Sequence, residues 1–495
     1  MIESQIPALI ALTYVLFAVL TPVFGLWKTR FAQPSAVAGA GIATLLSVLG
    51  LVHFIQDGAI RYFFGGWQPP VGIEFVYDGL SAFVVLVINA IAFIVLLQSG
   101  KISNREFPGK EMPYFTISML LMLGFNGMVL TGDVFNLYVF LEISSLASYA
   151  LIAIGEKRAP YSSFRYLIIG TIGGTLYLLG IGFLYTVTGT LNIIDMSQIL
   201  PQVGLNSAVF AGLILMVIGI GVKAALFPMH GWLPDSYTYA ASSSSSLIAP
   251  IGTKVAAYIL FRILMYLFGF ELTDAIFPLS TFIGILAVIG ILYGSIMAIA
   301  QTELKRMLAF SSISQIGYVI MGLSLANPFG FAGALLHVLN HAVMKACLFL
   351  VSGNLRYREG HTDIRLFDES YRKKYPWTMA SFTVAAISMV GLPPLAGFFS
   401  KWYLALGTIE NENWIFLAVI LISSLLNAVY FFRILEKVYM KQPGESTADL
   451  DISKVESNEV SFSMLSPVML LAVALFVIGF ANAAIVGFLM GIYPM

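Results

Sequence analysis

Long apolar stretches separated by short polar connections run through nearly the whole chain. A helix needs about 20 apolar residues to cross the hydrocarbon core of a bilayer, and a window of that length finds fourteen candidate spans. They lie near residues 6–27, 35–55, 79–99, 112–131, 133–154, 163–188, 206–230, 241–269, 275–301, 305–325, 328–354, 376–404, 412–436 and 461–490. The pattern predicts an all-α, multi-pass membrane protein.

Three connections between the spans are substantial. Residues 56–78 include most of the segment GGWQPPVGIEFVYDG, residues 355–375 are rich in basic side chains, and residues 437–460 include the polar run KQPGESTADLDISK. We expect the third to be a solvated loop without a domain of its own. The first span has no basic residues before it and no small-residue cleavage site after it, which favours a retained helix over a signal peptide.

Composition agrees with a membrane protein and narrows its chemistry. Hydrophobic residues make up 59% of the 495 residues, charged residues make up 11%, and the mean hydropathy is +0.88. The single cysteine, Cys347, can form no disulfide within the chain and cannot hold an iron–sulfur cluster by itself. No glycine-rich phosphate loop follows a strand-like run. We therefore expect no cofactor in this chain, so that any redox chemistry belongs to a partner.

Charged residues in the connections differ in sign from one side to the other. Bases gather after odd-numbered spans: Lys28, Arg30, Lys101, Arg105, Lys110, Lys157, Arg158, Arg165, Lys305, Arg306, Arg356, Arg358, Arg365, Arg372, Lys373, Lys374, Arg433, Lys437, Lys441 and Lys454. Connections after even-numbered spans hold mainly acids, with Arg61 as their base. Because cytoplasmic loops carry the excess of Lys and Arg, this sidedness predicts an inner-membrane protein with both termini outside. Nucleic acid is not an implied partner.

Five ionisable side chains lie inside apolar spans: Glu142, Lys223, Lys254, Lys345 and Lys401. A charge near the bilayer centre costs at least about 2.5 to 3.5 kcal/mol on insertion scales, so such a group is a functional hypothesis by default. Together the five predict a path for ions. The alternative is that some of them are interfacial or structural charges.

Two spans that carry a lysine are also interrupted. In GVKAALFPMHGWLPD, Lys223 precedes Pro228, and in SMVGLPPLAGFFSKWYLALG, Pro393 and Pro394 precede Lys401. Proline removes a backbone donor and clashes with the preceding turn, so both helices should break and free backbone groups to face polar side chains or water. Paired broken helices are typical of transporters with internal repeats. A proline kink with an incidental lysine is the alternative.

Several motifs resemble one family along nearly the whole chain. They are GDVFNLYVFLEISSLASYALIA, GVKAALFPMHGWLPDSY, GTKVAAYILFR, ELKRMLAFSSISQIGY, HVLNHAVMKACLFLVSG and GLPPLAGFFSKW. These are similar to the antiporter-like subunits of Mrp-type cation/proton antiporters and of the membrane arm of respiratory complex I. The resemblance implies two inverted five-helix repeats, spans four to eight and nine to thirteen, with spans seven and twelve broken. It divides the chain into residues 1–111, a first half-channel at 112–270, a second at 271–436, and a loop with a last helix at 437–495.

The resemblance also implies a role for each buried ionisable residue. Glu142 and Lys223 match a pair, Lys254 a connecting lysine, and Lys401 the end of the second half-channel. His337, His341 and Lys345 match a relay, and their spacing of four residues places all three on one helix face. His230 and Asp133 are further candidates for supporting residues.

Two alternatives remain open for the histidines. Residues four apart on a helix can bind a metal, but no third ligand is in sight and a lysine shares the face, so we expect no metal site. A core histidine with satisfied hydrogen bonds is a more natural interpretation for His337 than for His341.

The start of the eighth span departs from the family pattern. Relatives usually carry Ala-Pro and mixed small residues there, whereas this chain has AASSSSSLIAP, with Pro250 displaced. Outside a membrane Ser242–Ser246 would be a flexible linker, but inside a span serines hydrogen-bond to neighbouring helices or water. The departure predicts an altered local shape at the cytoplasmic mouth.

The mechanism that these residues favour is stepwise proton passage coupled through charge. Two unit charges about 10 Å apart interact by about 1.7 kcal/mol at an effective dielectric near 20. Moving one charge across 100 mV is worth about 2.3 kcal/mol. Since the two energies are similar, a shift in one charged group is enough to pass a protonation state to the next.

The most specific interpretation is a proton-translocating component of a multisubunit Na⁺/H⁺ antiporter, with other membrane subunits, H⁺, Na⁺ and lipid as partners. The external segment before Gly79 looks like that of the D-type Mrp subunit, and Lys401 stands where the M-type complex I subunit has a glutamate. The long lateral helix of the largest complex I subunit is also not expected. The alternatives are a proton-pumping subunit of a redox-driven complex, such as a membrane-bound hydrogenase or a quinone oxidoreductase, and a non-conducting structural subunit.

Overall fold

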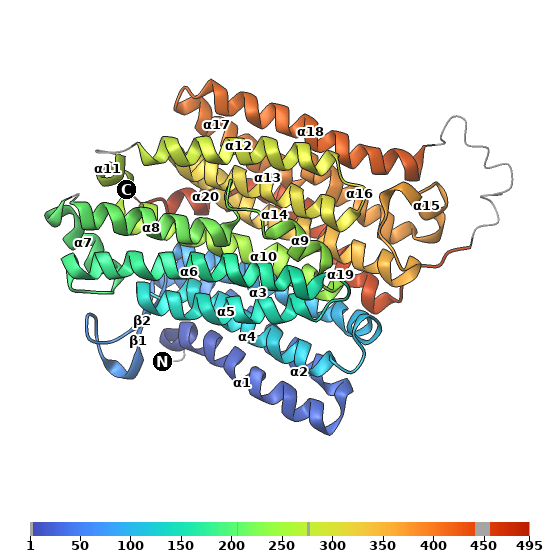
Figure 1. Cartoon of the computed structure of the whole chain (residues 1–495), viewed down its shortest axis with the longest axis horizontal. Coiled ribbons are helices and arrows are strands. Elements are labelled where there is room, and N and C mark those ends of the chain that lie inside the picture. Colours follow the sequence, from blue (N-terminus) through green and yellow to red (C-terminus); the bar gives the residue numbers. More distant parts are fainter. Residues whose placement is uncertain (1–2, 205, 275–277, 441–455, 495) are drawn as a thin grey trace.

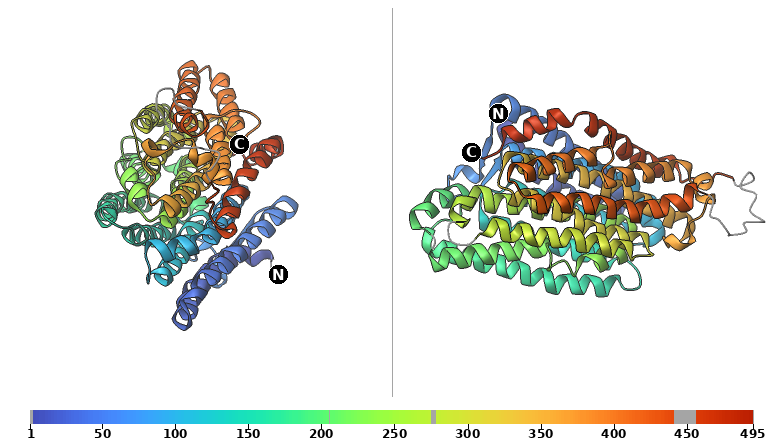
Figure 2. Two further views of the ribbon diagram at one scale, coloured as in Figure 1. Left: turned by 90° about the vertical axis from the view of Figure 1, so that its right-hand side faces the viewer. Right: turned by 90° about the horizontal axis from the view of Figure 1, so that it is seen from above.

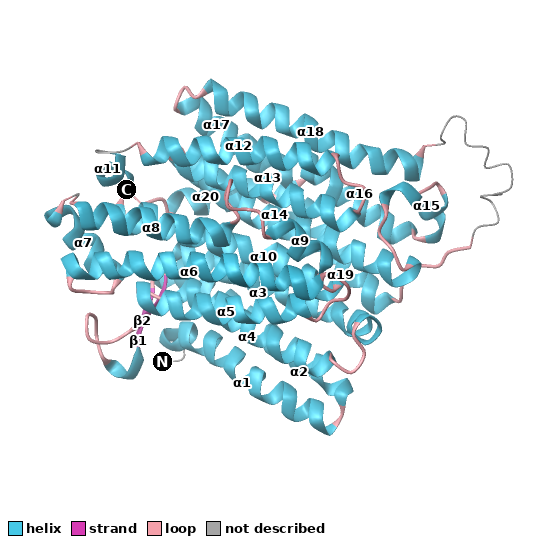
Figure 3. Ribbon diagram, viewed as in Figure 1, coloured by secondary structure: helices cyan, strands magenta, loops and turns pink. Residues whose placement is uncertain are grey.

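The computed structural model describes residues 3–204, 206–274, 278–440 and 456–494. Within these ranges, thirteen helices are long and apolar enough to cross a membrane, which confirms the predicted class. They run side by side along the long axis of the molecule (Figure 1), and Figure 3 shows how little of the chain is not helical. They are α1 (Ile6–Trp27), α2 (Ala32–Asp57), α3 (Gly79–Glu106), α4 (Glu111–Leu130), α5 (Val134–Ala153), α6 (Ala159–Thr188), α8 (Ser207–Ala224), α10 (Ser242–Phe261), α12 (Leu279–Ile299), α13 (Leu304–Ser324), α14 (Pro328–Glu359), α18 (Trp414–Tyr439) and α19 (Phe462–Phe480).

Three predicted spans are interrupted in the structure. The helix of the seventh, α8, ends at Ala224, before Pro228, and the short α9 (Leu233–Tyr239) follows just beyond the predicted end of the span. The twelfth consists of α16 (Pro376–Val390) and α17 (Ala396–Glu410). Each break follows a left-handed residue, Ala225 at φ 56° and Gly391 at φ 93°, where the chain leaves the helix before the prolines. The fourteenth span divides between α19 and α20 (Asn482–Gly491). The breaks therefore leave free carbonyl groups within the bundle.

The two ends of the bundle differ in structure. At one end, which we call the hairpin end, lie an antiparallel hairpin of β1 (Ile60–Phe63) and β2 (Glu74–Tyr77), the helices α7 (Ile193–Val203) and α11 (Phe270–Asp274), and both ends of the described chain (Figure 1). At the other, which we call the basic end, lies α15 (Ser370–Lys374) with the arginine-rich connection before it. Residues 441–455 of the predicted polar loop lie outside the described residues.

Ion pairs hold the connections at both ends. At the hairpin end the buried Glu74 carboxylate accepts two hydrogen bonds of 2.8 Å from Arg61 and one of 2.7 Å from Asn192. At the basic end the hydrogen bonds from Arg365 lower the pKa of Asp363 to about 2. These contacts join the hairpin to the start of α7 and order the connection that follows α14.

The central helices include α10 and α14, which carry Lys254 and the row of His337, His341 and Lys345. Helices α10, α13 and α14 are buried along most of their length, whereas α1 and α2 project from one edge of the bundle (Figure 2). Side chains on α10, α13 and α14 are therefore shielded from lipid, and their polar groups must find partners inside the protein or bind water.

Candidate functional site

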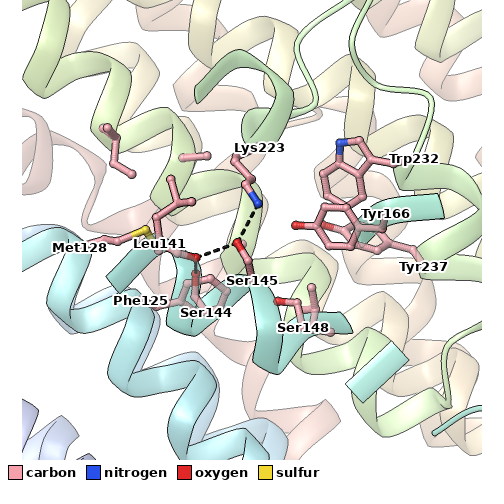
Figure 4. A pocket seen from close by; sticks show the side chains of 14 residues that line it. Phe125, Met128, Leu141, Ser144, Ser145, Ser148, Tyr166, Lys223, Trp232 and Tyr237 are labelled. Atoms are coloured by element: carbon pink, nitrogen blue, oxygen red, sulfur yellow. Dashed lines mark hydrogen bonds between the residues drawn. The ribbon is translucent and has the colours of Figure 1, made fainter. Parts of the chain in front are cut away.

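Lys223 lies in the last turn of α8, just before the helix break. Its ammonium group donates a hydrogen bond of 2.7 Å to the Ser145 hydroxyl (Figure 4). It donates a second hydrogen bond, of 3.2 Å, to the Tyr149 hydroxyl. It also lies 5.6 Å and 5.7 Å from the ring centres of Tyr149 and Tyr166. A helix C-terminus and aromatic faces both favour a cation. The site therefore stabilises a buried ammonium group with neutral partners.

Glu142 reaches the same side of α6 as Lys223, one helical turn away. A methyl group added at Gly174 would lie 2.3 Å from the Glu142 carboxylate, and one added at Gly170 would lie 3.0 Å from the Lys223 ammonium. The two glycines are four residues apart, which is about 6 Å along the helix. The bare backbone of α6 thus leaves room for both charges of the predicted pair. No sequence signal marked these two glycines, since their value depends on what packs against them.

A small cavity of about 30 Å³ adjoins the Lys223 ammonium. Its polar lining comes from Ser144, Ser145, Ser148, Tyr166 and Tyr237, all visible in Figure 4. A water molecule needs about 10 to 15 Å³ of such space, so the cavity has room for about two or three. The cavity also touches α10 on either side of Thr253, at Gly252 and Ala256, and the Tyr237 side chain faces Thr253.

Lys254 is fully buried on α10. It follows Thr253, which the Tyr237 side chain faces. Its ammonium group donates a hydrogen bond of 2.8 Å to the Ala249 carbonyl oxygen. His341 is also fully buried, and neither of its ring nitrogens has a hydrogen-bond partner within the described chain. Helix α10 packs along α14, which carries both histidines. The structure therefore places Lys254 beside the α14 residues.

His337 connects the α14 row to the second broken helix. Its ring nitrogens lie 2.9 Å from the Ser400 hydroxyl and 3.0 Å from the Gln315 side-chain oxygen, so it is satisfied in a way that His341 is not. The neighbouring Lys401 donates hydrogen bonds of 3.1 Å and 2.9 Å to the carbonyl oxygens of Met389 and Val390. Those carbonyls are free because α16 ends there, before Pro393 and Pro394.

Lys345 lies one turn beyond His341 on α14 and is fully buried. Its ammonium group donates a hydrogen bond of 2.7 Å to the Leu308 carbonyl oxygen and a second to the Ser311 hydroxyl. A further buried lysine lies three residues before Leu308. The sequence predicts Lys305 in the basic connection before the tenth span, but in the structure it is 1% exposed in the first turn of α13. Sequence alone misplaced it because it stands at the boundary of its span.

The two supporting candidates have local contacts of their own. Asp133 caps α5, accepting a hydrogen bond of 2.7 Å from the backbone amide of Asn136. His230 lies in the turn that contains Pro228, where its ring packs against Phe227 and Tyr293 at 5.4 Å and 4.8 Å between ring centres. These contacts orient the α5 helix and the α8–α9 turn.

The serine run forms the first turns of α10 and is buried. Ser245 and Ser246 donate to carbonyl oxygens one turn earlier, at 3.1 Å and 2.8 Å, while the Glu106 carboxylate accepts from the Ser242 amide at 2.6 Å. A carboxylate at the N-terminus of a helix is stabilising, because its negative charge lies near the positive end of the helix dipole. The run is therefore helical and not a flexible linker. Ser242 bonds to a neighbouring helix, as expected for a serine inside a span, whereas Ser245 and Ser246 bond to carbonyl oxygens at the start of their own helix.

The fold and the row of buried lysines define a class, a multi-pass membrane protein with ionisable groups between its helices. Residues 131–427 match the family described as "NADH:quinone oxidoreductase/Mrp antiporter, TM", and the chain belongs to this family. This confirms the resemblance found in the sequence.

Relatives in this family carry names of two kinds. The chain is 42% identical over 461 residues to the N-type subunit of NADH-quinone oxidoreductase from Desulforudis audaxviator, covering 92% of this chain and 90% of the relative. It is 32% identical over 441 residues to the D-type subunit of a Na(+)/H(+) antiporter from Alkalihalophilus pseudofirmus, covering 88% and 86%. Among solved structures, one chain of the membrane-bound sulfane sulfur reductase, an archaeal respiratory membrane complex, is similar with a TM-score of 0.89 and 29% identity, covering 98% of this chain and 96% of that one.

Proposed function

We propose that this chain is the proton-translocating antiporter-like subunit of a hetero-oligomeric membrane complex. Protons would move along Glu142 and Lys223, then Lys254, then the α14 residues His337, His341 and Lys345, and finally Lys401. The observation that carries the proposal is that Glu142 and Lys223 approach the same side of α6. The Glu142 carboxylate packs against Gly174, and the Lys223 ammonium packs against Gly170. Carboxylate and ammonium groups about 6 to 10 Å apart interact by about 1.7 to 2.8 kcal/mol at an effective dielectric of 20.

Polar groups between the lysines support a continuous route. The cavity beside Lys223 meets α10 near Thr253, and the buried hydroxyls of Tyr237 and Thr253 face each other without forming a hydrogen bond of ordinary geometry to any group in the described chain. The two ring nitrogens of His341 are likewise buried and have no hydrogen-bond partner in the described chain. Buried polar groups are bonded to protein or to ordered water in nearly all proteins. These atoms are therefore suited to hold the water molecules that would carry a proton from Lys223 to Lys254 and onward.

The proposal is tested on the assembled complex in proteoliposomes by replacing Lys254 with Met. Methionine has a similar length and no charge, so packing should be kept while proton transfer stops. Lys437→Met is the matched control, because that lysine is only partly buried, lies at the basic end away from the proposed row, and donates a hydrogen bond of 3.1 Å to the Arg365 carbonyl oxygen. We expect proton flux to fall at least tenfold in Lys254→Met and to stay within twofold in Lys437→Met. Equal flux in the two variants would refute the proposal.

Two driving forces are compatible with the same row of residues. Subunits named for a Na⁺/H⁺ antiporter and for a quinone oxidoreductase both align along most of the chain. The antiporter interpretation predicts that a sodium gradient alone drives proton movement in proteoliposomes. The redox interpretation predicts movement only with an electron donor and acceptor, and a partner with a nickel–iron or iron–sulfur centre in the purified complex.

We also propose that the hairpin end is extracytoplasmic and that the bundle contains two inverted half-channels, at residues 112–270 and 271–436. The arginines and lysines of residues 355–375 at the basic end support this orientation under the positive-inside rule. A cysteine placed at exposed Trp67 should react with an impermeant thiol reagent from outside intact cells, whereas one at exposed Leu366 should not. The native Cys347 is buried and should not interfere.

A further inference from the structure

The basic end contains a cluster of charged and hydroxyl side chains that the row described above does not use. Glu106, at the end of α3, accepts from both the amide and the hydroxyl of Ser242, and it lies 3.6 Å from the Arg356 guanidinium. Lys305 donates a hydrogen bond of 2.6 Å to the Ala240 carbonyl oxygen, two residues before Ser242, whose amide donates to Glu106. The cluster joins the starts of α10 and α13 to the ends of α3 and α14.

Exposure falls steadily from the surface to the row of buried lysines. The side chains of Arg356 and Glu106 are 29% and 13% exposed, whereas Lys305 and Lys345 are 1% and 0% exposed. The Glu106 carboxylate is therefore accessible to water, whereas the Lys305 amine is buried deeper in the bundle. Burying an additional lysine in a membrane protein is costly, which favours a function for Lys305.

One helix, α13, leads from Lys305 to Lys345. The Leu308 carbonyl oxygen, three residues from Lys305, accepts hydrogen bonds from Ser311 and Ser312 at 3.0 Å each and from the Lys345 ammonium at 2.7 Å. Three residues are about 4.5 Å along a helix. Lys345 also donates to the Ser311 hydroxyl. Hydroxyl groups therefore line α13 where it passes from one lysine to the next.

The neighbouring helices add polar atoms to the same end. The Ser352 hydroxyl of α14 is fully buried and has no hydrogen-bond partner within the described chain, and neither has the hydroxyl of Ser244. The first turn of α10 packs against α14 closely enough that a methyl group added at Gly353 would lie 3.5 Å from Ser242. Unpartnered, buried hydroxyls are the groups that bind internal water.

From this arrangement we infer that Glu106 and Lys305 form a proton-uptake site at the basic end that loads Lys345 directly. The Glu106 carboxylate takes a proton from water and passes it to the neutral Lys305 amine, which restores the carboxylate. The Lys305 ammonium then gives a proton to a neutral Lys345, with the Ser311 hydroxyl accepting one proton as it donates another. Each step moves one proton and changes no oxidation state. The inference rests on the proposed proton transport and adds a second opening to it.

The same contacts would also fit a purely structural role, in which Glu106 and Lys305 act as a clamp that holds the start of α10 in place. Substitutions at the three positions separate this role from proton transfer. Lys305→Arg keeps the positive charge, the hydrogen bond to Ala240 and the attraction to Glu106, but a guanidinium does not release its proton. Glu106→Gln likewise keeps a side-chain oxygen for Ser242 and cannot carry a proton. Ser242→Ala weakens the clamp and leaves both proton carriers in place.

The experiment measures proton uptake from the basic side of the assembled complex in vesicles with a pH-sensitive dye. We expect uptake to fall at least tenfold in Lys305→Arg and in Glu106→Gln, with normal assembly, and to stay within twofold in Ser242→Ala. Uptake at the wild-type rate in Lys305→Arg overturns the inference. If Lys305→Arg does not assemble, Glu106→Gln decides by the same criterion. Loss of uptake in Lys254→Met together with normal uptake in Lys305→Arg would refute this site and leave the proposed function intact.

Discussion

A single methyl group on α6 tests whether the distance between Glu142 and Lys223 matters. In Gly174→Ala the new methyl carbon would lie 2.3 Å from a Glu142 carboxylate oxygen and 3.5 Å from the carboxyl carbon. Ordinary contact begins near 3.4 Å, so the oxygen must move by about 1 Å or more. Because it is the far end of a flexible side chain, the fold should accept this change while the carboxylate moves.

The size of the effect follows from the charge interaction. We take the spacing of the two glycines, about 6 Å, as the separation of the two charges. If the displaced carboxylate raises this separation to between about 7 and 9 Å, the interaction weakens by roughly 0.4 to 1 kcal/mol at an effective dielectric of 20. This corresponds to a two- to fivefold loss of rate if the pair controls proton transfer. We expect that loss in proton flux through the assembled complex, with normal assembly.

Gly182 provides the control on the same helix. A methyl group added there meets no atom within 4 Å, so Gly182→Ala should leave flux unchanged and stabilise α6 slightly. In a Glu142→Gln background, Gly174→Ala should cause no additional loss, because the charge that it displaces is already absent. Equal flux in Gly174→Ala and Gly182→Ala, or a further loss in the Glu142→Gln background, would refute the reasoning.

Further substitutions address other parts of the row. Glu142→Gln should reduce proton flux at least tenfold with the complex intact, since it removes the charge while keeping the shape; a fully active variant would remove the pair from the mechanism. Lys401→Glu should be milder than Lys401→Ala if the position needs only a titratable group, and equal losses would instead indicate a need for positive charge. The isolated chain should show no transport in proteoliposomes, because its function is proposed for a complex, and transport by the purified chain alone would contradict this.

The helices and their breaks could be predicted from sequence because they depend on local chemistry. Apolar length set the spans, and the prolines at 228, 393 and 394 placed the interruptions close to where the chain leaves the helix. The hairpin of β1 and β2 and the helix α7 were not predicted. Their strands and turns are short, and the Arg61–Glu74–Asn192 contact that holds them joins residues 118 positions apart.

The candidate residues were predictable, but their surroundings were not. A lysine in an apolar span is conspicuous, whereas Gly170, Gly174, Tyr237 and Thr253 gain importance only from the side chains that the bundle packs against them. Lys305 is a second example. At the edge of a span, the local sequence does not distinguish a buried lysine from a solvated one. The Ala240 carbonyl oxygen that accepts its hydrogen bond lies 65 residues away in the chain.

The central claim is that proton transport by the complex requires the Lys223 ammonium group, and proton flux in a Lys223→Ala complex tests it most directly. The assembled complex would be placed in proteoliposomes, and flux compared with the wild type at equal protein content. The account predicts normal assembly with flux reduced to the passive leak of the vesicles. Flux near the wild-type rate in a fully assembled Lys223→Ala complex would contradict it.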